Sequence, residues 1–174
     1  MLSIQEEHLP PLLHHVLMEI RNNADCMPKK QLFNLLEAEW GSDWRSHFEN
    51  FNEQPVAAAS IGQVHEAWLK DGRKVAVKIQ YPGVAESIES DLKNLMTLIK
   101  YTNLLPQRLF LDVLCQEIKT ELLAECDYEN EAKFFDLFRS LLSAYKGYSI
   151  PNIIPSFSTS KILTMDFLHG ISMD

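Results

Sequence analysis

The 174-residue sequence lacks features that mark several classes of protein. It contains no run of about 20 consecutive apolar residues, the length that a transmembrane helix needs. Its three cysteines, Cys26, Cys115 and Cys126, are odd in number and do not have the spacing of a metal site. We therefore expect free thiols in a reducing compartment, with neither a disulfide framework nor a protein-bound metal centre.

Positive charge is also scarce. The 16 Lys and Arg residues are outnumbered by 24 Asp and Glu residues, which gives a net charge of −8. Because proteins that bind nucleic acid gather Lys and Arg against the phosphates, we expect no nucleic-acid partner. Met1 is followed directly by patterned sequence, so we expect no Arg- and Ser-rich transit peptide within these residues.

The most informative stretch runs from Val56 to Pro82 and reads VAAASIGQVHEAWLKDGRKVAVKIQYP. Asp71-Gly72 stands between two runs of β-type residues, and this is a strong signal for a tight hairpin. The sequence therefore predicts one strand from Gln63 to Leu69 and a second from Lys74 to Tyr81.

The second strand carries a lysine between apolar neighbours. Alternation of side chains divides its residues into two faces, Val75, Val77 and Ile79 on one and Ala76, Lys78 and Gln80 on the other. The apolar face is expected to join the core. On the other face, a flat base would lie over Ala76 while Lys78 reaches the phosphates. The simpler alternative is an edge strand with an exposed lysine.

A loop of small residues precedes the hairpin. It consists of Ala57, Ala58, Ala59 and Ser60, followed after one residue by Gly62. Small side chains let backbone N–H groups approach an anion, and nucleotide-binding hairpins carry a glycine-rich turn at this place. We therefore expect these residues to lie over the phosphates of a nucleotide.

The stretch PVAAASIGQVHEAWLKDGRKVAVKIQYPGV, followed downstream by ECDYENEA, closely resembles the UbiB family of atypical kinase-like proteins. In that family an alanine-rich loop replaces the glycine-rich loop of ordinary kinases. The resemblance covers nearly the whole sequence. The eukaryotic members, which support coenzyme Q biosynthesis, are the nearer match.

The resemblance implies an α+β fold, namely the N-terminal lobe of a protein kinase built on an antiparallel sheet. Residues 1–52 are expected to form an N-terminal helical extension, and the spacing of apolar residues predicts helices over Leu2 to Asn22 and over Lys29 to about Trp40. Residues 53–174 would form the lobe, with a family-specific helical insert at about 84–125.

After the hairpin, apolar residues at helical spacing predict a helix that starts near Val84 and a long helical region from about Leu109 to Tyr145. An ordinary kinase has its glutamate-bearing helix directly after the lysine strand. We nevertheless interpret Glu86, Glu89 and Asp91 as a solvated helix face, because the resemblance places them in the insert.

Five acidic residues fall within eleven positions, from Glu121 to Glu131. From the residues alone they are equally compatible with a plain helix surface, and Asp127 also fits a helix N-cap. By resemblance, ECD matches the Glu-x-Asp motif of the family. This match implies that Glu125 and Asp127 are active-site carboxylates and that Glu131 is the ion-pair partner of Lys78.

Two further strands are predicted near the C-terminal end, over Ser149 to Ile154 and over Lys161 to Phe167. The segment DFLHG resembles the link between the two lobes of a kinase, where backbone groups near Phe167 and Leu168 would bond the edge of the adenine. His169 is interpreted as a surface loop residue, and His65 is likewise given no chemical role.

By resemblance, a Lys-x-Gly-Gln motif lies directly upstream of MLSIQ, and the catalytic loop and the metal-holding aspartate lie in a second, C-terminal lobe. We therefore expect this sequence to be a fragment, or a gene model begun at an internal Met, that lacks the C-terminal lobe. The parent would use ATP, and Mg²⁺ would arrive with the nucleotide, its protein ligands lying outside this chain. The fragment alone is expected to be inactive.

The hypothesis from the sequence is therefore the ATP-binding lobe of an atypical kinase or ATPase that supports ubiquinone biosynthesis. A mitochondrial location rests on the resemblance alone, and so do coenzyme Q biosynthetic proteins and membrane lipid as partners. The alternative is a non-catalytic helical interaction module derived from such a protein.

Overall fold

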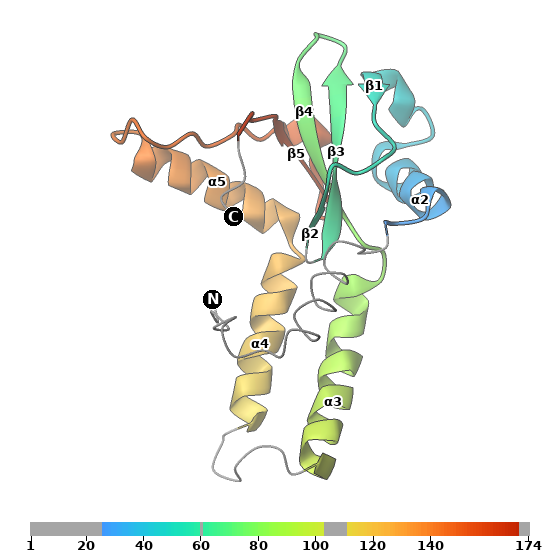
Figure 1. Cartoon of the computed structure of the whole chain (residues 1–174), viewed down its shortest axis with the longest axis vertical. Coiled ribbons are helices and arrows are strands. Elements are labelled where there is room, and N and C mark those ends of the chain that lie inside the picture. The colour runs from blue at the N-terminus through green and yellow to red at the C-terminus, as the bar shows by residue number, and fades with distance from the viewer. Residues whose placement is uncertain (1–25, 60, 103–110, 171–174) are drawn as a thin grey trace, which may run out of the picture.

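The computed structural model describes residues 26–59, 61–102 and 111–170. A five-stranded antiparallel sheet forms the upper part of the molecule, and a pair of helices extends away from it (Figure 1). In chain order the elements are α2 (Lys29–Trp40), the short 3-10 helix η2 (Trp44–His47), β1 (Phe48–Phe51), β2 (Ala57–Ala59), β3 (Gly62–Leu69), β4 (Lys74–Gln80), α3 (Val84–Thr102), α4 (Leu111–Glu125), α5 (Tyr128–Leu142), the 3-10 helix η3 (Pro155–Phe157) and β5 (Ile162–Asp166).

The predicted hairpin is confirmed as β3 and β4, with bounds within one residue of those expected. Gly72 has a φ of 84°, in the left-handed region that glycine reaches without a Cβ penalty. The carboxylate of Asp71 accepts bonds from the backbone N–H and the guanidinium of Arg73, at 3.0 and 2.8 Å. These two residues fix the turn and therefore the register of the strands that it joins.

The strand order is β1-β3-β4-β5, and β2 also pairs with β3. The alanine segment was expected to be a loop, and this expectation is wrong for Ala57–Ala59. These residues form strand β2, in which Ala57 pairs with Val64 and Ala59 with Gly62. Ser60 lies outside the described residues. Pairing with β3 therefore holds the three alanines in the sheet, and they do not form a loop.

The apolar face of β4 belongs to the core, as predicted. Val75, Val77 and Ile79 are all 0% exposed, and burial of each such side chain contributes about 1.5–3 kcal/mol of transfer free energy. Helix α2 covers this face of the sheet (Figure 1). The core also contains a cluster of aromatic rings, made up of Trp40, Trp44, Phe48, Phe51 and Phe157.

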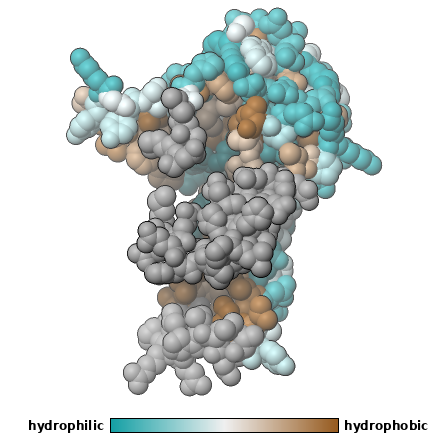
Figure 2. Space-filling view, in the orientation of Figure 1, coloured by the Kyte–Doolittle hydropathy of each residue, from teal (hydrophilic) through white to brown (hydrophobic). Residues whose placement is uncertain are grey.

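Helices α3 and α4 pack side by side and are tied by an ion pair between Lys119 and Glu89 at 2.8 Å. Glu86, Glu89 and Asp91 are all exposed, so their interpretation as a solvated face is confirmed. Apolar side chains are also exposed on this pair, and Figure 2 shows hydrophobic surface over it. None of the helices that the structure describes combines the length and the apolar composition needed to cross a membrane.

The long helical region expected from about Leu109 to Tyr145 is two helices, because the chain breaks between Glu125 and Tyr128. Asp127 is the N-cap of the second helix, since its carboxylate accepts a bond from the backbone N–H of Asn130 at 3.1 Å. A side-chain cap of this kind competes with continuation of the helix.

Other predicted elements have mixed outcomes. The helix over Lys29 to Trp40 and the last strand are confirmed. The strand expected over Ser149 to Ile154 is wrong, because only a single bridge between Ile153 and Met165 forms there. Strand β1 lies within residues 1–52 and was not predicted. The helix expected over Leu2 to Asn22 lies outside the described residues.

Three buried polar groups form a chain beneath β3. The backbone N–H of Met27 donates to Oε1 of Gln63 at 2.9 Å, so the amide nitrogen of Gln63 faces Nε2 of His65 at 2.8 Å and donates to it. Nδ1–H of His65 then donates to the carbonyl of Asn52 at 2.8 Å. This chain requires a neutral imidazole. His65 is 0% exposed and therefore buried, whereas His169 is exposed at the surface.

Burial lowers the pKa of His65, whereas an unfolded chain has a value of about 6.5. Below that pH the unfolded state binds the additional proton, so the free energy of unfolding should fall as the pH drops from about 6.5. We expect His65→Gln to flatten this fall, as measured by urea unfolding at pH 7.5, 6.5 and 5.5. His169→Gln, at an exposed position, is the control and should keep the wild-type slope. A wild-type slope in His65→Gln would contradict the prediction.

Candidate active site

The structure brings together two residues that lie 53 positions apart in the sequence. Nζ of Lys78 donates to both carboxylate oxygens of Glu131, at 2.8 and 2.7 Å. The side chains are only 20% and 29% exposed. The pair that sequence analysis expected is therefore present, and each partner is held by two short bonds in a partly buried place.

Local structure explains how each partner reaches this place. Alternation along β4 points Lys78 away from the core residues on either side of it. Glu131 lies in the first turn of α5, where its N–H makes an early helical bond to the carbonyl of Asp127 at 3.0 Å. A carboxylate near a helix N-terminus is also favoured by the helix dipole.

Tyr128 forms the floor under the lysine. The Nζ of Lys78 lies 4.6 Å from the centre of the Tyr128 ring, a geometry that favours a cation–π contact. Tyr128 is 0% exposed, and burial raises the pKa of its phenol. Its hydroxyl has no hydrogen-bond partner within the described residues. The ammonium is thus enclosed by a ring on one side and a carboxylate on another.

A cavity of about 550 Å³ opens beside this pair. Its charged lining residues are Lys78, Glu121, Glu125 and Glu131, one cation against three carboxylates. Glu125, predicted as an active-site carboxylate, is therefore in the cavity wall, whereas Asp127 caps α5. Glu121 was not singled out from the sequence, although it precedes Glu125 by four residues on α4 and so shares its face.

The other residues predicted to bind nucleotide surround this cavity less directly. Ala76 lies two residues before Lys78 on the same face of β4 and pairs with Met165 of β5. Phe167 and Leu168 follow β5 directly, and the N–H of Phe167 donates to the carbonyl of Lys74 at 3.2 Å. Among the predicted nucleotide-binding residues that the structure describes, only Lys78 lines the cavity.

Gly62 has a packing role that the sequence did not indicate. It is buried, and a Cβ at this position would overlap the carbonyl oxygen of Ile79 on the neighbouring strand. The glycine is therefore required by the close approach of β3 and β4. This requirement exists whether or not an anion binds nearby.

Other chemistries find little support in this region. Burial and the neighbouring Glu125 carboxylate raise the pKa of the Cys126 thiol, which is 8% exposed, so a reactive thiolate is disfavoured. Within the part of the chain that the structure describes, no group of three or more His, Cys, Asp or Glu side chains is placed to hold a metal ion.

The profile of the ABC1 atypical kinase-like domain matches residues 19–174. The chain belongs to the ABC1 atypical kinase-like family. The resemblance inferred from the motifs is thereby confirmed, and so is the α+β fold of a kinase-like N-terminal lobe.

Relatives in the ABC1 family match along the whole chain. The mitochondrial atypical kinase coq-8 of Caenorhabditis elegans is 44% identical over 175 residues, covering 100% of this chain and 23% of that protein. The mitochondrial atypical kinase COQ8 of Saccharomyces cerevisiae is 44% identical over 171 residues, covering 98% of this chain and 34% of that protein. The chain thus spans only a quarter to a third of these relatives.

A solved structure has a similar fold. The complex of Rv3197 with erythromycin from Mycobacterium tuberculosis matches with a TM-score of 0.65 and 32% sequence identity. The match covers 98% of this chain and 43% of that chain. At this identity the likeness supports both a common fold and a common family.

The packing of Gly62 can be tested by substitution. We expect Gly62→Ala to lower the free energy of unfolding by about 2–3 kcal/mol, because the added methyl overlaps backbone atoms that cannot rotate away. Urea unfolding measures this change. Gly147→Ala is the matched control, since a Cβ there would meet no atom within 4 Å. Equal stability of the two variants would show that β3 and β4 are not packed in this way.

Proposed function

We propose that this chain is the nucleotide-binding lobe of an atypical kinase or ATPase and that it binds ATP at the open face of its sheet. The Lys78–Glu131 ion pair carries the proposal. In protein kinases a strand lysine, paired with a helix glutamate, contacts the α- and β-phosphates. The part-exposed ammonium of Lys78 would make the same contact here.

The charges of the cavity favour a nucleotide that carries its own cation. Three glutamates line the cavity against one lysine, so a bare polyphosphate would be repelled. A magnesium ion bound to the phosphates would neutralise much of that repulsion. Glu121 and Glu125 would then face the bound cation, and the phosphates would supply most of its ligands.

The base would lie on β4 beyond the lysine. Ala76 presents only a methyl group, which leaves room for a flat ring over the strand. Since the N–H of Phe167 is already bonded to the carbonyl of Lys74, the edge of adenine would meet the carbonyl of Phe167 or the backbone of Leu168. Strand β2, which pairs with β3, would lie over the phosphates and replace the glycine-rich turn.

The biological role proposed for the whole protein is support of coenzyme Q biosynthesis in mitochondria. This proposal rests on the relatives, which are named mitochondrial COQ8 atypical kinases. Coenzyme Q biosynthetic proteins and membrane lipid would be its partners. The non-catalytic interaction module is the weaker alternative, because an interaction role does not require a partly buried ion pair beside an open cavity.

Substitution of the lysine tests the nucleotide site. We expect Lys78→Ala to weaken binding of magnesium-ATP at least tenfold, as measured by isothermal titration, since a bond to a charged group contributes about 1.5–3 kcal/mol. Lys119→Ala is the control, because Lys119 is also an ion-paired lysine but lies on the helical pair. Both variants should keep the wild-type circular dichroism spectrum. Wild-type affinity in folded Lys78→Ala would refute the site.

The alanine strand offers a second test. Pairing with β3 holds the backbone of Ala59, and glycine at this position weakens a strand by about 0.5–1 kcal/mol. Because a looser segment closes more readily on phosphates, we expect Ala59→Gly to tighten binding of magnesium-ATP about three- to fivefold. The matched control is Ala85→Gly on α3, away from the cavity. Unchanged or weaker binding by Ala59→Gly would mean that β2 does not restrain the nucleotide site.

A further inference from the structure

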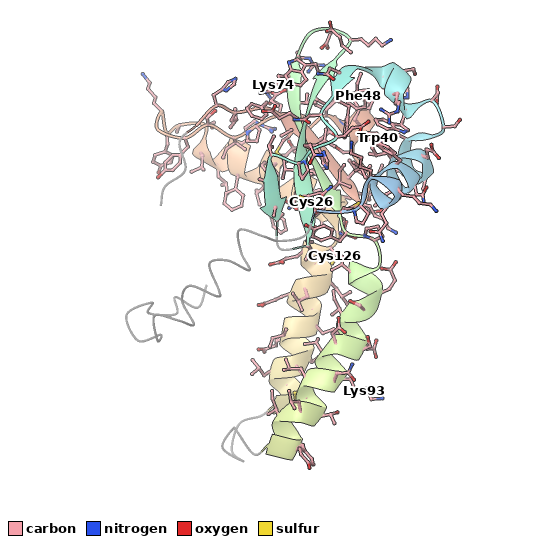
Figure 3. All side chains as sticks on the ribbon, turned by 45° about the vertical axis from the view of Figure 1, so that its right-hand side comes forward. Cys26, Trp40, Phe48, Lys74, Lys93 and Cys126 are labelled. Atoms are coloured by element: carbon pink, nitrogen blue, oxygen red, sulfur yellow. The ribbon has the colours of Figure 1, made fainter. Side chains whose placement is uncertain are left out.

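Gln80 is a buried polar residue that the proposed function does not use. It is 3% exposed and lies on the same face of β4 as Lys78, two residues further along. Its amide nitrogen donates to the backbone carbonyl of Cys126 at 2.8 Å. Cys126 lies in the turn between α4 and α5, just below the sheet (Figure 3). One strand face therefore contacts this turn through Gln80 and helix α5 through Lys78.

The carbonyl of Cys126 needs such a donor. Helix α4 ends at Glu125, and the last carbonyls of a helix have no partner within it. Cys126 is 8% exposed, so water has little access to this group. Leaving a buried carbonyl unbonded is unfavourable, and the amide of Gln80 removes that cost. The bond thereby fixes the position of the turn relative to β4.

The residues that follow Cys126 link the position of this turn to that of Glu131. The N–H of Tyr128 donates to the carbonyl of Ser160 at 3.2 Å, which ties the start of α5 to the loop before β5. Asp127 caps the same turn. Glu131 follows the first residue of α5 by three positions, or about 4.5 Å along a helix, so the first turn of the helix carries the carboxylate.

We propose that Gln80 is a positioning residue that holds the first turn of α5 where Glu131 meets Lys78. The amide of Gln80 fixes the turn, the turn fixes the start of the helix, and the helix places the carboxylate. The ion pair does not depend on a nucleotide, so the proposal stands apart from the proposed function. Only its consequence for ATP affinity rests on that function.

Gln63 provides a matched control on the other face of the hairpin. It is 1% exposed, makes two buried hydrogen bonds, and lies among the core residues beneath β3. Substitution of either glutamine by leucine removes buried hydrogen bonds and should lower stability. Only the loss of Gln80 should alter the surroundings of the Lys78 ammonium.

The test is the reactivity of Lys78 toward acetic anhydride in the nucleotide-free chain, followed by mass spectrometry. Lys119 serves as the internal reference. We expect Gln80→Leu to raise the relative acetylation rate of Lys78 at least threefold, because the carboxylate of Glu131 is displaced from Lys78. We expect Gln63→Leu to leave the rate unchanged. In a Glu131→Gln background, Gln80→Leu should add no further increase. An unchanged rate in Gln80→Leu, or an equal rise in both leucine variants, would overturn the proposal.

Two further measurements test the proposal if Gln80→Leu does not fold. Gln80→Met keeps the length of the side chain but cannot donate, and it should raise the rate as Gln80→Leu does. In the wild-type chain, NMR should detect a coupling across the hydrogen bond between Nε2 of Gln80 and the carbonyl carbon of Cys126. Absence of that coupling would overturn the proposal without any variant.

A nucleotide titration separates this proposal from the proposed function. We expect Gln80→Leu to weaken binding of magnesium-ATP about threefold, and to have no additional effect in Lys78→Ala. If acetylation of Lys78 responds to Gln80→Leu while the wild-type chain binds no magnesium-ATP, the positioning role holds and the nucleotide site fails. If ATP binds and acetylation does not respond, the nucleotide site stands without the positioning role.

Discussion

The bond between the ammonium of Lys78 and the carboxylate of Glu131 is the interaction on which the arrangement of the site depends. Two charges that are partly removed from water stabilise a structure only when each is fully bonded. Here two short hydrogen bonds and an aromatic ring meet that requirement. The bond also joins β4 to α5, so the helix cannot move without exposing an unpaired charge.

The two faces of the sheet have separate tasks. One face is closed by α2 and the aromatic cluster. Hydrogen bonds that link Met27, Gln63, His65 and Asn52 satisfy buried polar groups beneath it. Among the described residues, the start of α5 and apolar side chains of α3 and α4 cover part of the other face, around Tyr128 and Leu163. This division leaves a rigid strand beneath an open cavity, which is the condition for holding a lysine in one place while a ligand comes and goes.

Membership of the ABC1 family relates this lobe to longer proteins. The relatives named here are about three to four times as long as this chain. Within the lobe, the structure places one cation, Lys78, among three carboxylates that line the same cavity. Coupling between sheet and helix α5 keeps these charges at their distances.

The sequence alone determined the features that depend on neighbouring residues. Asp71-Gly72 predicts the hairpin, and alternation along β4 predicts that Lys78 points away from the core, because turn geometry and strand pleat are local properties. Resemblance of ECDYENEA to a family motif supplied Glu131. Only the tertiary structure decided that the alanines pair as β2, that Gly62 is required by Ile79, and that Gln80 bonds to Cys126. These three features depend on contacts between segments that are distant in the sequence, and local residue patterns do not predict the strength of such contacts.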